Sequence, residues 1–220
     1  MTQSIRIETE RHVLGEGAAF IKLSLPVLDG GTDSALGKRL SAYTERLKKG
    51  FLHYAGTKLL AASASRGGGA PYGGGLNTVL CHQSAGVLSF YIDATVTDGN
   101  GRRIHRLPFL WSVKGGTLIK PGRMFQKRAE KKLLPLILKG IDEKAAALSL
   151  PLYSDYAAIA RRRFDTERFY ISPMGAVFYY QGRTLNERPE PFALPLAVHA
   201  LRPLLQEGAE ELLWDGGEGQ

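Results

Sequence analysis

The single cysteine of the chain stands beside a histidine, the pairing that nucleophilic catalysis by a thiol would use. Cys81 and His82 lie in "LNTVLCHQS", a stretch with the pattern of a strand. Successive side chains of a strand point to opposite faces, so two adjacent residues cannot form a catalytic dyad on one surface. We therefore interpret Cys81 as a small core residue.

The other histidines and the acids form no recognisable catalytic or metal-binding pattern. His105 stands among Arg102, Arg103 and Arg106, which would keep its ring neutral and make it a poor metal ligand. One cysteine and five scattered histidines cannot supply the paired spacing of a structural zinc site. Neither G-x-S-x-G nor H-E-x-x-H occurs. We therefore predict no catalytic residue, metal or cofactor, and keep an undetected hydrolase as a third alternative only.

A glycine-rich stretch, "SRGGGAPYGGGLN", suggests a loop that could cradle a phosphate. Such a loop leads from a strand directly into the N-terminus of a helix, and its P-loop form ends in Gly-Lys-Ser/Thr. Here the chain continues into "LNTVLCHQSAGVLSFYIDATVT", which is strand-like, and Gly-Lys-Ser/Thr is absent. We predict a flexible surface loop instead.

Clusters of basic residues are the remaining candidates for function. Residues 127, 128, 131 and 132 recur one turn apart in a predicted helix, so they would form a continuous basic strip. Three arginines at 161–163 lead into an aromatic-rich stretch, and that mixture is typical of sites for single-stranded nucleic acid. Solvated helix faces and a hairpin core would explain the same residues without a ligand. The candidate partner-binding residues are Lys127, Arg128, Lys131, Lys132, Arg161, Arg162, Arg163, Arg102 and Arg103.

The charge of the chain favours an anionic partner. Its 220 residues carry a net charge of +8, and the fourteen residues from Glu207 onward hold five acids and no base. Residues 1–206 therefore carry +13, from 29 basic and 16 acidic side chains. A basic body favours nucleic acid, wall polymers or anionic lipid. The sequence has no run of about 18 apolar residues and no signal-peptide pattern, so we expect no membrane span and a cytoplasmic location.

Hydrophobic periodicity predicts the elements of the N-terminal half. Within 18–28 apolar residues alternate as in a half-buried strand that ends at Pro26. From Ser34 to Tyr54 they recur at steps of three and four, which predicts a long amphipathic helix. Residues 76–119 then read as a three-stranded antiparallel meander with a hairpin turn at "DGNG".

The C-terminal half contains further helices. Residues 125–148 are a helical candidate in which Pro135 and Gly140 predict a kink or two shorter helices. Another helix is predicted over 155–164. The stretch "FALPLAVHALRPLL" predicts a short strand and then a helix with Pro195 near its first turn.

Between these helices, "RFYISPMGAVFYYQG", residues 168–182, reads as an aromatic hairpin. Phe169, Phe178 and Tyr180 follow the period-two pattern of a core face, with Tyr170 and Tyr179 on the reverse face. We interpret this stretch as core rather than as a platform for stacking bases.

Tight turns between strands and segregated helices together predict an α+β fold. The expected architecture is antiparallel sheets, a meander plus a C-terminal hairpin, packed with a long amphipathic helix and further helices. We expect one domain over 1–206, with candidate sub-lobes 1–122 and 123–206, followed by an acidic tail, 207–220, that ends a helix and frays.

The segment "RFYISPMGAVFYYQGRTLNERPEPFALPL" resembles the C-terminal signature of a bacterial domain-of-unknown-function family. The family occurs in the extracytoplasmic domain of RsiV-type anti-sigma factors and in the N-terminal region of PdaC-type peptidoglycan deacetylases. The matching positions are Phe169–Tyr170, Gly175, Val177–Tyr179, Pro191–Phe192 and Pro195–Leu196. Upstream, "LSFYIDATVTDGNGRRIHRLPFLWSVKGGTLIKPGRMF" is similar too, so the resemblance covers about residues 15–205.

The resemblance implies an α+β receptor-like domain without catalytic machinery, and relatives that are extracytoplasmic. The anti-sigma members bind lysozyme, so lysozyme is a partner by analogy, although like-charge repulsion from a basic body disfavours it. We predict a non-catalytic binding or sensing module for a macromolecular or anionic partner, either a protein or a polyanion. The alternative is a cytosolic nucleic-acid-associated protein that uses the basic clusters.

Overall fold

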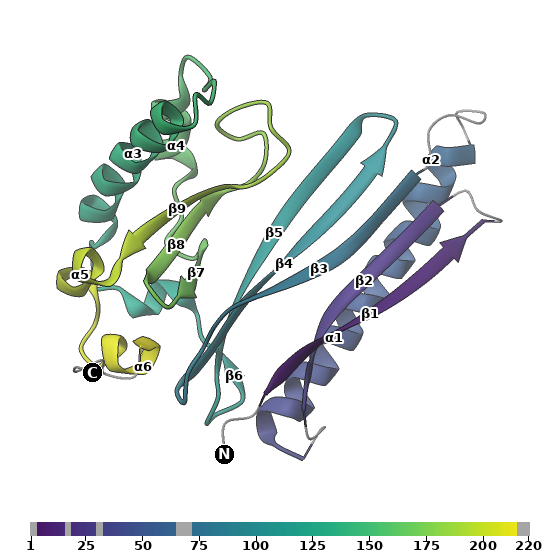
Figure 1. Cartoon of the computed structure of the whole chain (residues 1–220), viewed down its shortest axis with the longest axis horizontal. Helices are drawn as coiled ribbons and strands as arrows, with labels where there is room; N and C mark the ends of the chain where they lie inside the picture. Colours follow the sequence, from purple (N-terminus) through teal and green to yellow (C-terminus); the bar gives the residue numbers. More distant parts are fainter. Residues whose placement is uncertain (1–3, 16–18, 30–32, 65–71, 215–220) are drawn as a thin grey trace. The chain divides into compact units, whose positions relative to one another are not determined.

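The fold combines two sheets with helices, as predicted. The computed structural model describes residues 4–15, 19–29, 33–64 and 72–214. One sheet has six strands in the order β1-β2-β3-β4-β5-β6, and the other has three in the order β7-β8-β9 (Figure 1). The strands are β1 Ile5–Leu14, β2 Ala19–Leu28, β3 Tyr72–Gln83, β4 Val87–Asp98, β5 Gly101–Ser112, β6 Thr117–Leu118, β7 Phe169–Ser172, β8 Gly175–Tyr180 and β9 Phe192–Ala197. The α-helices are α1 Ala35–Tyr54, α2 Leu60–Ala64, α3 Glu130–Ala147, α4 Tyr156–Arg163, α5 Val198–Leu201 and α6 Ala209–Trp214. The α+β class, with its meander and C-terminal hairpin, is confirmed.

Two compact units alternate along the chain. The first comprises Met1–Val79, Ile92–Leu107 and Lys114–Thr117, and the second comprises Leu80–Tyr91, Pro108–Val113 and Leu118–Gln220. Strands β3, β4 and β5 each contribute residues to both units. The expected sub-lobes, 1–122 and 123–206, divide the chain differently, because periodicity does not reveal where a strand passes from one unit to the next.

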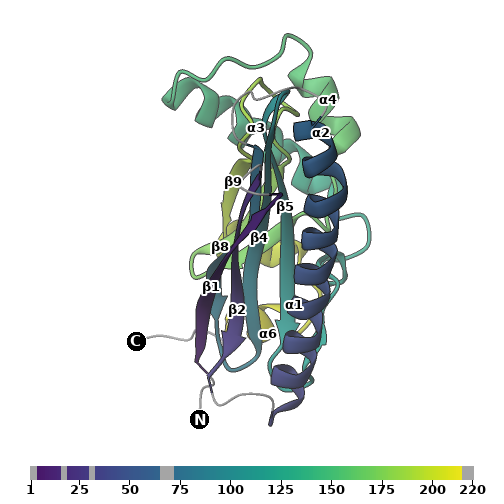
Figure 2. The same ribbon diagram turned by 90° about the vertical axis from the view of Figure 1, so that its right-hand side faces the viewer.

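In the first unit, α1 lies along one face of β1 and β2 (Figure 2). The Ser34 hydroxyl caps the helix by accepting a hydrogen bond from the Gly37 N–H at 2.9 Å. Leu36 and Leu40 of the predicted apolar stripe are buried. Tyr54, the last residue of that stripe, is exposed, and a π-helical turn, Ala55–Leu59, follows it with Ala55 and Leu59 buried.

Strands β2 and β3 pair in parallel, from Ala19 opposite Tyr72 to Ser24 opposite Asn77. The sequence suggested antiparallel pairs only, so this pair differs from expectation. Parallel neighbours need a long crossover connection. Helix α1 with the helical turns after it supplies that connection.

Strand β1 was not predicted. It pairs antiparallel with β2 over its full length, from Ile5 opposite Leu28 to Leu14 opposite Ala19. Most of its side chains are exposed, which is why apolar periodicity does not reveal it. Pro26 was expected to end β2 but lies inside it. The pairing of β2 with β3 stops at Ser24, so the missing N–H of Pro26 leaves no hydrogen bond to β3 unmade.

The prediction of a glycine-rich surface loop was wrong from residue 72 onward; residues 65–71 lie outside the described residues. Gly73, Gly74 and Gly75 lie within β3. A Cβ at Gly74 would stand 2.7 Å from the Thr95 carbonyl oxygen, and one at Gly75 would stand 2.2 Å from that of Lys22. The glycines therefore let the backbones of neighbouring strands approach closely, which is a packing role rather than phosphate binding.

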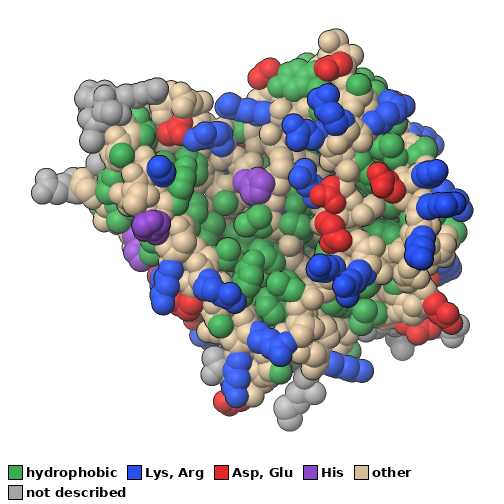
Figure 3. All heavy atoms as spheres, turned by 180° about the vertical axis from the view of Figure 1, so that it is seen from behind, with side chains coloured by type: hydrophobic (Ala, Val, Ile, Leu, Met, Phe, Trp, Pro, Cys, Tyr) green, Lys and Arg blue, Asp and Glu red, His purple; other side chains and the backbone are tan. Residues whose placement is uncertain are grey.

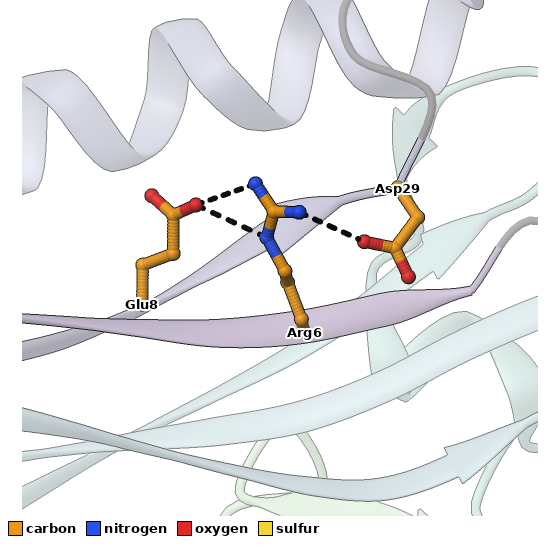
Figure 4. A network of polar contacts seen from close by, with 3 residues as sticks. All are labelled: Arg6, Glu8 and Asp29. Atoms are coloured by element: carbon orange, nitrogen blue, oxygen red, sulfur yellow. Dashed lines mark hydrogen bonds and ion pairs between the residues drawn. The ribbon is translucent and has the colours of Figure 1, made fainter.

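Charged side chains on the α1 side of β1 have partners. Arg6 contacts Glu8 at 2.6 Å and Asp29 at 3.5 Å, which joins β1 to the residue after β2 (Figure 4). Lys48 of α1 donates a hydrogen bond to Glu10 at 2.7 Å, which lowers the pKa of the Glu10 carboxyl and raises that of the Lys48 ammonium. Charges on this side of the strand are thus balanced within the first unit.

The core of the second unit forms between α3 and the three-stranded sheet. The buried residues of α3, spaced by one turn, are Leu133, Ile137 and Ile141. Phe169 and Phe178 of the hairpin are each 2% exposed, as the period-two pattern predicted. Tyr179, expected on the reverse face, is also buried, so both faces of β8 are covered.

Helix α3 is shorter than predicted. It begins at Glu130, because Phe125 forms a β-bridge with Leu205 and its carbonyl accepts a hydrogen bond from the Gln206 side chain at 3.0 Å. From Glu130 it continues through Pro135 as one helix rather than two.

Within the described ranges, no helix combines the length and hydropathy needed to cross a bilayer.

The C-terminal segment also differs from expectation. Pro195 lies in β9 opposite Val177, not in a helix, and β9 is an edge strand, where a missing N–H is tolerated. In the expected acidic tail, residues 209–214 form the helix α6, in line with the helix expected there, but they belong to the second unit; the expected fraying falls on 215–220, which lie outside the described residues. There Leu213 is buried and the Trp214 indole N–H donates to the Ser172 carbonyl at 2.9 Å.

Candidate functional site

Cys81 and His82 have structural surroundings. The His82 Nε2 atom lies 2.9 Å from the Leu213 carbonyl oxygen, so the ring is held by α6 of the same unit. Cys81 was predicted to be a core residue but is only half-buried, because this end of β3 is partly covered. In the part of the chain that the structure describes, no group of three His, Cys, Asp or Glu residues could hold a metal ion.

The predicted basic strip on α3 is interrupted. Lys127 and Arg128 precede the helix, and Arg128 has a φ of 67°, so the two do not continue its helical spacing. Lys131 and Lys132 lie in its first turn. All four side chains are exposed. The helical strip was wrong because it required the helix to start at Phe125.

The arginines at 161–163 lie where the sequence placed them. They form the exposed last turn of α4, Tyr156–Arg163, where positive charge interacts favourably with the helix dipole. The helices α3 and α4 pack against each other in the second unit, and the Tyr156 hydroxyl hydrogen-bonds the Asp142 carboxylate. The arginine cluster and the basic residues around the start of α3 thus belong to one unit.

Arg102 and Arg103 lie in β5 and belong to the first unit. Arg103 forms an ion pair with Asp98 across the hairpin turn. Figure 3 shows Lys and Arg side chains spread over the face that it presents, with Asp and Glu among them. The nine candidate residues therefore belong to two different units, two of them to the first and seven to the second.

A shallow groove of about 400 Å³ lies on β2, β3 and β4 of the first unit. Its lining residues are Phe20, Lys22, Ser24, Tyr72, Gly73, Gly74, Gly75, Leu76, Asn77, Thr95 and Thr97. Phe20 is 54% exposed while the next residue, Ile21, is buried. A Cβ on Gly74 would lie 3.1 Å from the ring of Phe51 in α1, so its neighbours Gly73 and Gly75 face away from the helix. The groove is therefore on the sheet face opposite α1, hereafter the open face.

Strand register arranges the open face in three rows, because paired residues of neighbouring strands share a face. The rows are Val13, Phe20 and Gly73; Arg11, Lys22 and Gly75; and Thr9, Ser24 and Asn77. The first row is apolar, the second cationic and the third uncharged and polar. In the third, the Thr9 and Ser24 hydroxyls share a hydrogen bond of 2.9 Å.

Sequence reasoning missed this groove. The alternation of apolar residues in β2 could have located part of it. Because Ile21 and Leu23 face the core, Phe20, Lys22 and Ser24 must lie on the opposite face of the strand. The cross-strand neighbours could not be identified, because β1 was missed and the glycines were interpreted as a loop.

No family model matches the sequence, and no curated protein matches it. Among solved structures, the chain is similar to a member of the DUF3298 family from Bacteroides fragilis NCTC 9343, with 15% identity, a TM-score of 0.64 and coverage of 96% of each chain. It is also similar to a DUF3298 family protein from Pseudomonas aeruginosa PAO1, with 12% identity, a TM-score of 0.65 and coverage of 94% of this chain and 96% of the other. At these identities the likeness establishes a shared fold. It agrees with the resemblance to a domain of unknown function and leaves the link to anti-sigma factors and deacetylases a prediction.

Proposed function

We propose that this chain is a non-catalytic binding module and that its ligand site is the groove on the open face. The observation that carries the proposal is the composition of that groove: among its eleven lining residues, Lys22 alone has a charged side chain. Catalysis of acyl or phosphoryl transfer needs converging nucleophile, base or charge-stabilising groups. A concave surface with one aromatic wall, a glycine floor and a few polar groups suits binding instead.

The proposal keeps the binding or sensing role that the resemblance to envelope-sensing domains implied. The DUF3298 structures support it at the level of fold alone. A groove of this size suits a small molecule or the end of a larger one. Lysozyme stays a disfavoured partner, since the chain itself carries a net charge of +8.

Fragment binding followed by ¹H–¹⁵N NMR tests the site. We expect hits whose shift changes map to β2, β3 and β4 around Phe20, and we expect Phe20→Ala to weaken those hits about tenfold or more by removing the exposed aromatic wall. Met174→Ala is the matched control, because Met174 is 80% exposed and belongs to the other unit. Hits that map only to the second unit would contradict the proposal.

A second candidate function is polyanion binding by the basic residues near α3 and on α4. The observation that favours it is that these basic side chains are exposed and their charges are not neutralised by acids. Among the described residues, no acidic side chain pairs with Lys127, Arg128, Lys131, Lys132 or Arg161–Arg163. Cations in the first turn of α3 also oppose the helix dipole, which a bound anion would offset.

Salt dependence of binding to single-stranded DNA tests this candidate. If the three arginines of α4 contact phosphates, replacing all three with glutamine reduces the log–log salt slope by about 2, because each contact contributes about 0.7. Lys38→Gln with Lys49→Gln on α1 serves as the control, and its slope should match that of the wild type. Equal slopes for the arginine variant and the wild type would rule out this mode of binding.

A further inference from the structure

We propose that the groove binds an anionic amphiphile, a molecule with one carboxylate or phosphate head group on an apolar body. This inference rests on the proposed function, since it assigns a ligand class to the same site. The head group would lie over Lys22, which lines the groove, and over Arg11, its neighbour on β1. The apolar body would lie along Phe20, which lines the groove, and Val13, its neighbour on β1.

The cationic row of the open face brings two like charges together. Arg11 of β1 and Lys22 of β2 are directly opposite each other and both are exposed on the open face. Like charges directly opposite across two strands destabilise the pairing. Among the described residues no acidic side chain pairs with either cation, and the positions of β1, β2 and the glycine-rich part of β3 on this face include no acid. The repulsion is unrelieved in the chain itself, and an anion between the two cations would relieve it.

The charges on the α1 side of the same strand, in contrast, have partners. There Arg6 is paired with Glu8 and Asp29, and Glu10 is paired with Lys48. The charges are thus paired on one side of the strand, whereas Arg11 and Lys22 on the other have no acidic partner among the described residues. An overall excess of basic residues in the chain does not explain this difference between the two sides. The charge of the Arg11–Lys22 pair is complementary to an external anion.

Exposed apolar surface lies next to these cations. Val13 is 61% exposed and Phe20 is 54% exposed, and they are opposite each other one row along. The third member of that row is Gly73, so space rather than a side chain adjoins the Phe20 ring. Successive rows on one face are about 7 Å apart. A chain of roughly six carbons attached to the head group would therefore reach the aromatic ring.

The amphiphile is favoured over a nucleic acid because the open face offers two cations rather than a track of them. A phosphate backbone gains affinity from many contacts along a groove. It is favoured over a purely apolar ligand because such a ligand would leave the Arg11–Lys22 repulsion in place. Carboxylate and phosphate head groups share the same chemistry here, so the probes must separate them.

Calorimetric titration with ten-carbon probes tests the inference, using the full chain. Decanoate and decyl phosphate carry the two candidate head groups, while decanol and decyltrimethylammonium are the neutral and cationic controls. We expect either anionic probe to bind at least about tenfold more tightly than decanol, and the cationic probe to bind more weakly still. The tighter of the two anionic probes identifies the head group.

Variants of the charge pair complete the test. Arg11→Gln and Lys22→Gln should each weaken the anionic probe about tenfold and leave decanol unchanged, while Lys38→Gln on the opposite side of the sheet changes neither. Decanol binding as tightly as decanoate, or unchanged decanoate binding by the Arg11→Gln, Lys22→Gln double variant, would overturn the inference. Fragments that still map to the groove in that event would leave the proposed function standing. If fragments fail as well, both fall.

Discussion

Replacing Asp93 with alanine is expected to destabilise the protein by about 3 kcal/mol. Asp93 and Arg106 form a bidentate ion pair in the first unit, with the Arg106 Nε at 2.8 Å and a terminal nitrogen at 2.7 Å from the two carboxylate oxygens. The Arg106 side chain is 10% exposed, so removing the carboxylate takes away the bidentate ion pair that compensates the charge of a largely buried cation. Urea unfolding, extrapolated to zero denaturant, measures the change.

Two further variants decide whether burial causes this loss. In the double variant Asp93→Ala, Arg106→Met, the buried charge is gone, so we expect recovery of more than half of the lost stability. Glu8→Ala breaks an exposed ion pair of the same unit and should cost less than about 1 kcal/mol. If Asp93→Ala costs no more than Glu8→Ala, the pair is effectively solvated and the argument from burial fails.

The sequence predicted those elements whose apolar side chains repeat on one face. Helix α1 was recognised from its stripe and the hairpin β7–β8 from alternating aromatics, and both are where the pattern placed them. Both faces of strand β1 are largely exposed, so no buried apolar face marked it in the sequence. The start of α3 was misplaced because Phe125 is apolar at helical spacing yet is held by Leu205, eighty residues away in sequence. Local periodicity carries no information about such a contact.

The candidate site was harder to predict than the fold because it depends on register. Arg11 and Lys22 become neighbours only once β1 and β2 pair, and Gly75 joins them only through the parallel pair. The sequence instead drew attention to runs of charge, such as Arg161–Arg163, which need no tertiary structure to be noticed. A run of glycines between a helix and a β-branched stretch was a usable signal for a strand, since glycine inside a strand often marks close approach of another backbone.

Phe178→Ala is expected to destabilise the second unit by about 4 kcal/mol. The Phe178 ring lies 5.1 Å from that of Phe169 and 5.9 Å from that of Phe125, between centroids, and the residue is 2% exposed. Truncation would remove these aromatic contacts and leave a cavity that rigid neighbours cannot fill.

The matched control for that loss is Phe20→Ala, because Phe20 is the same residue type on an exposed sheet face. We expect it to change stability by less than about 1 kcal/mol. Urea unfolding gives both free energies, and amide hydrogen exchange assigns the loss to β7 and β8 rather than to the first unit. Equal losses in the two variants would mean that the hairpin is not the core of its unit. Unequal losses would establish that one aromatic stabilises the fold while the other is free to contact a ligand.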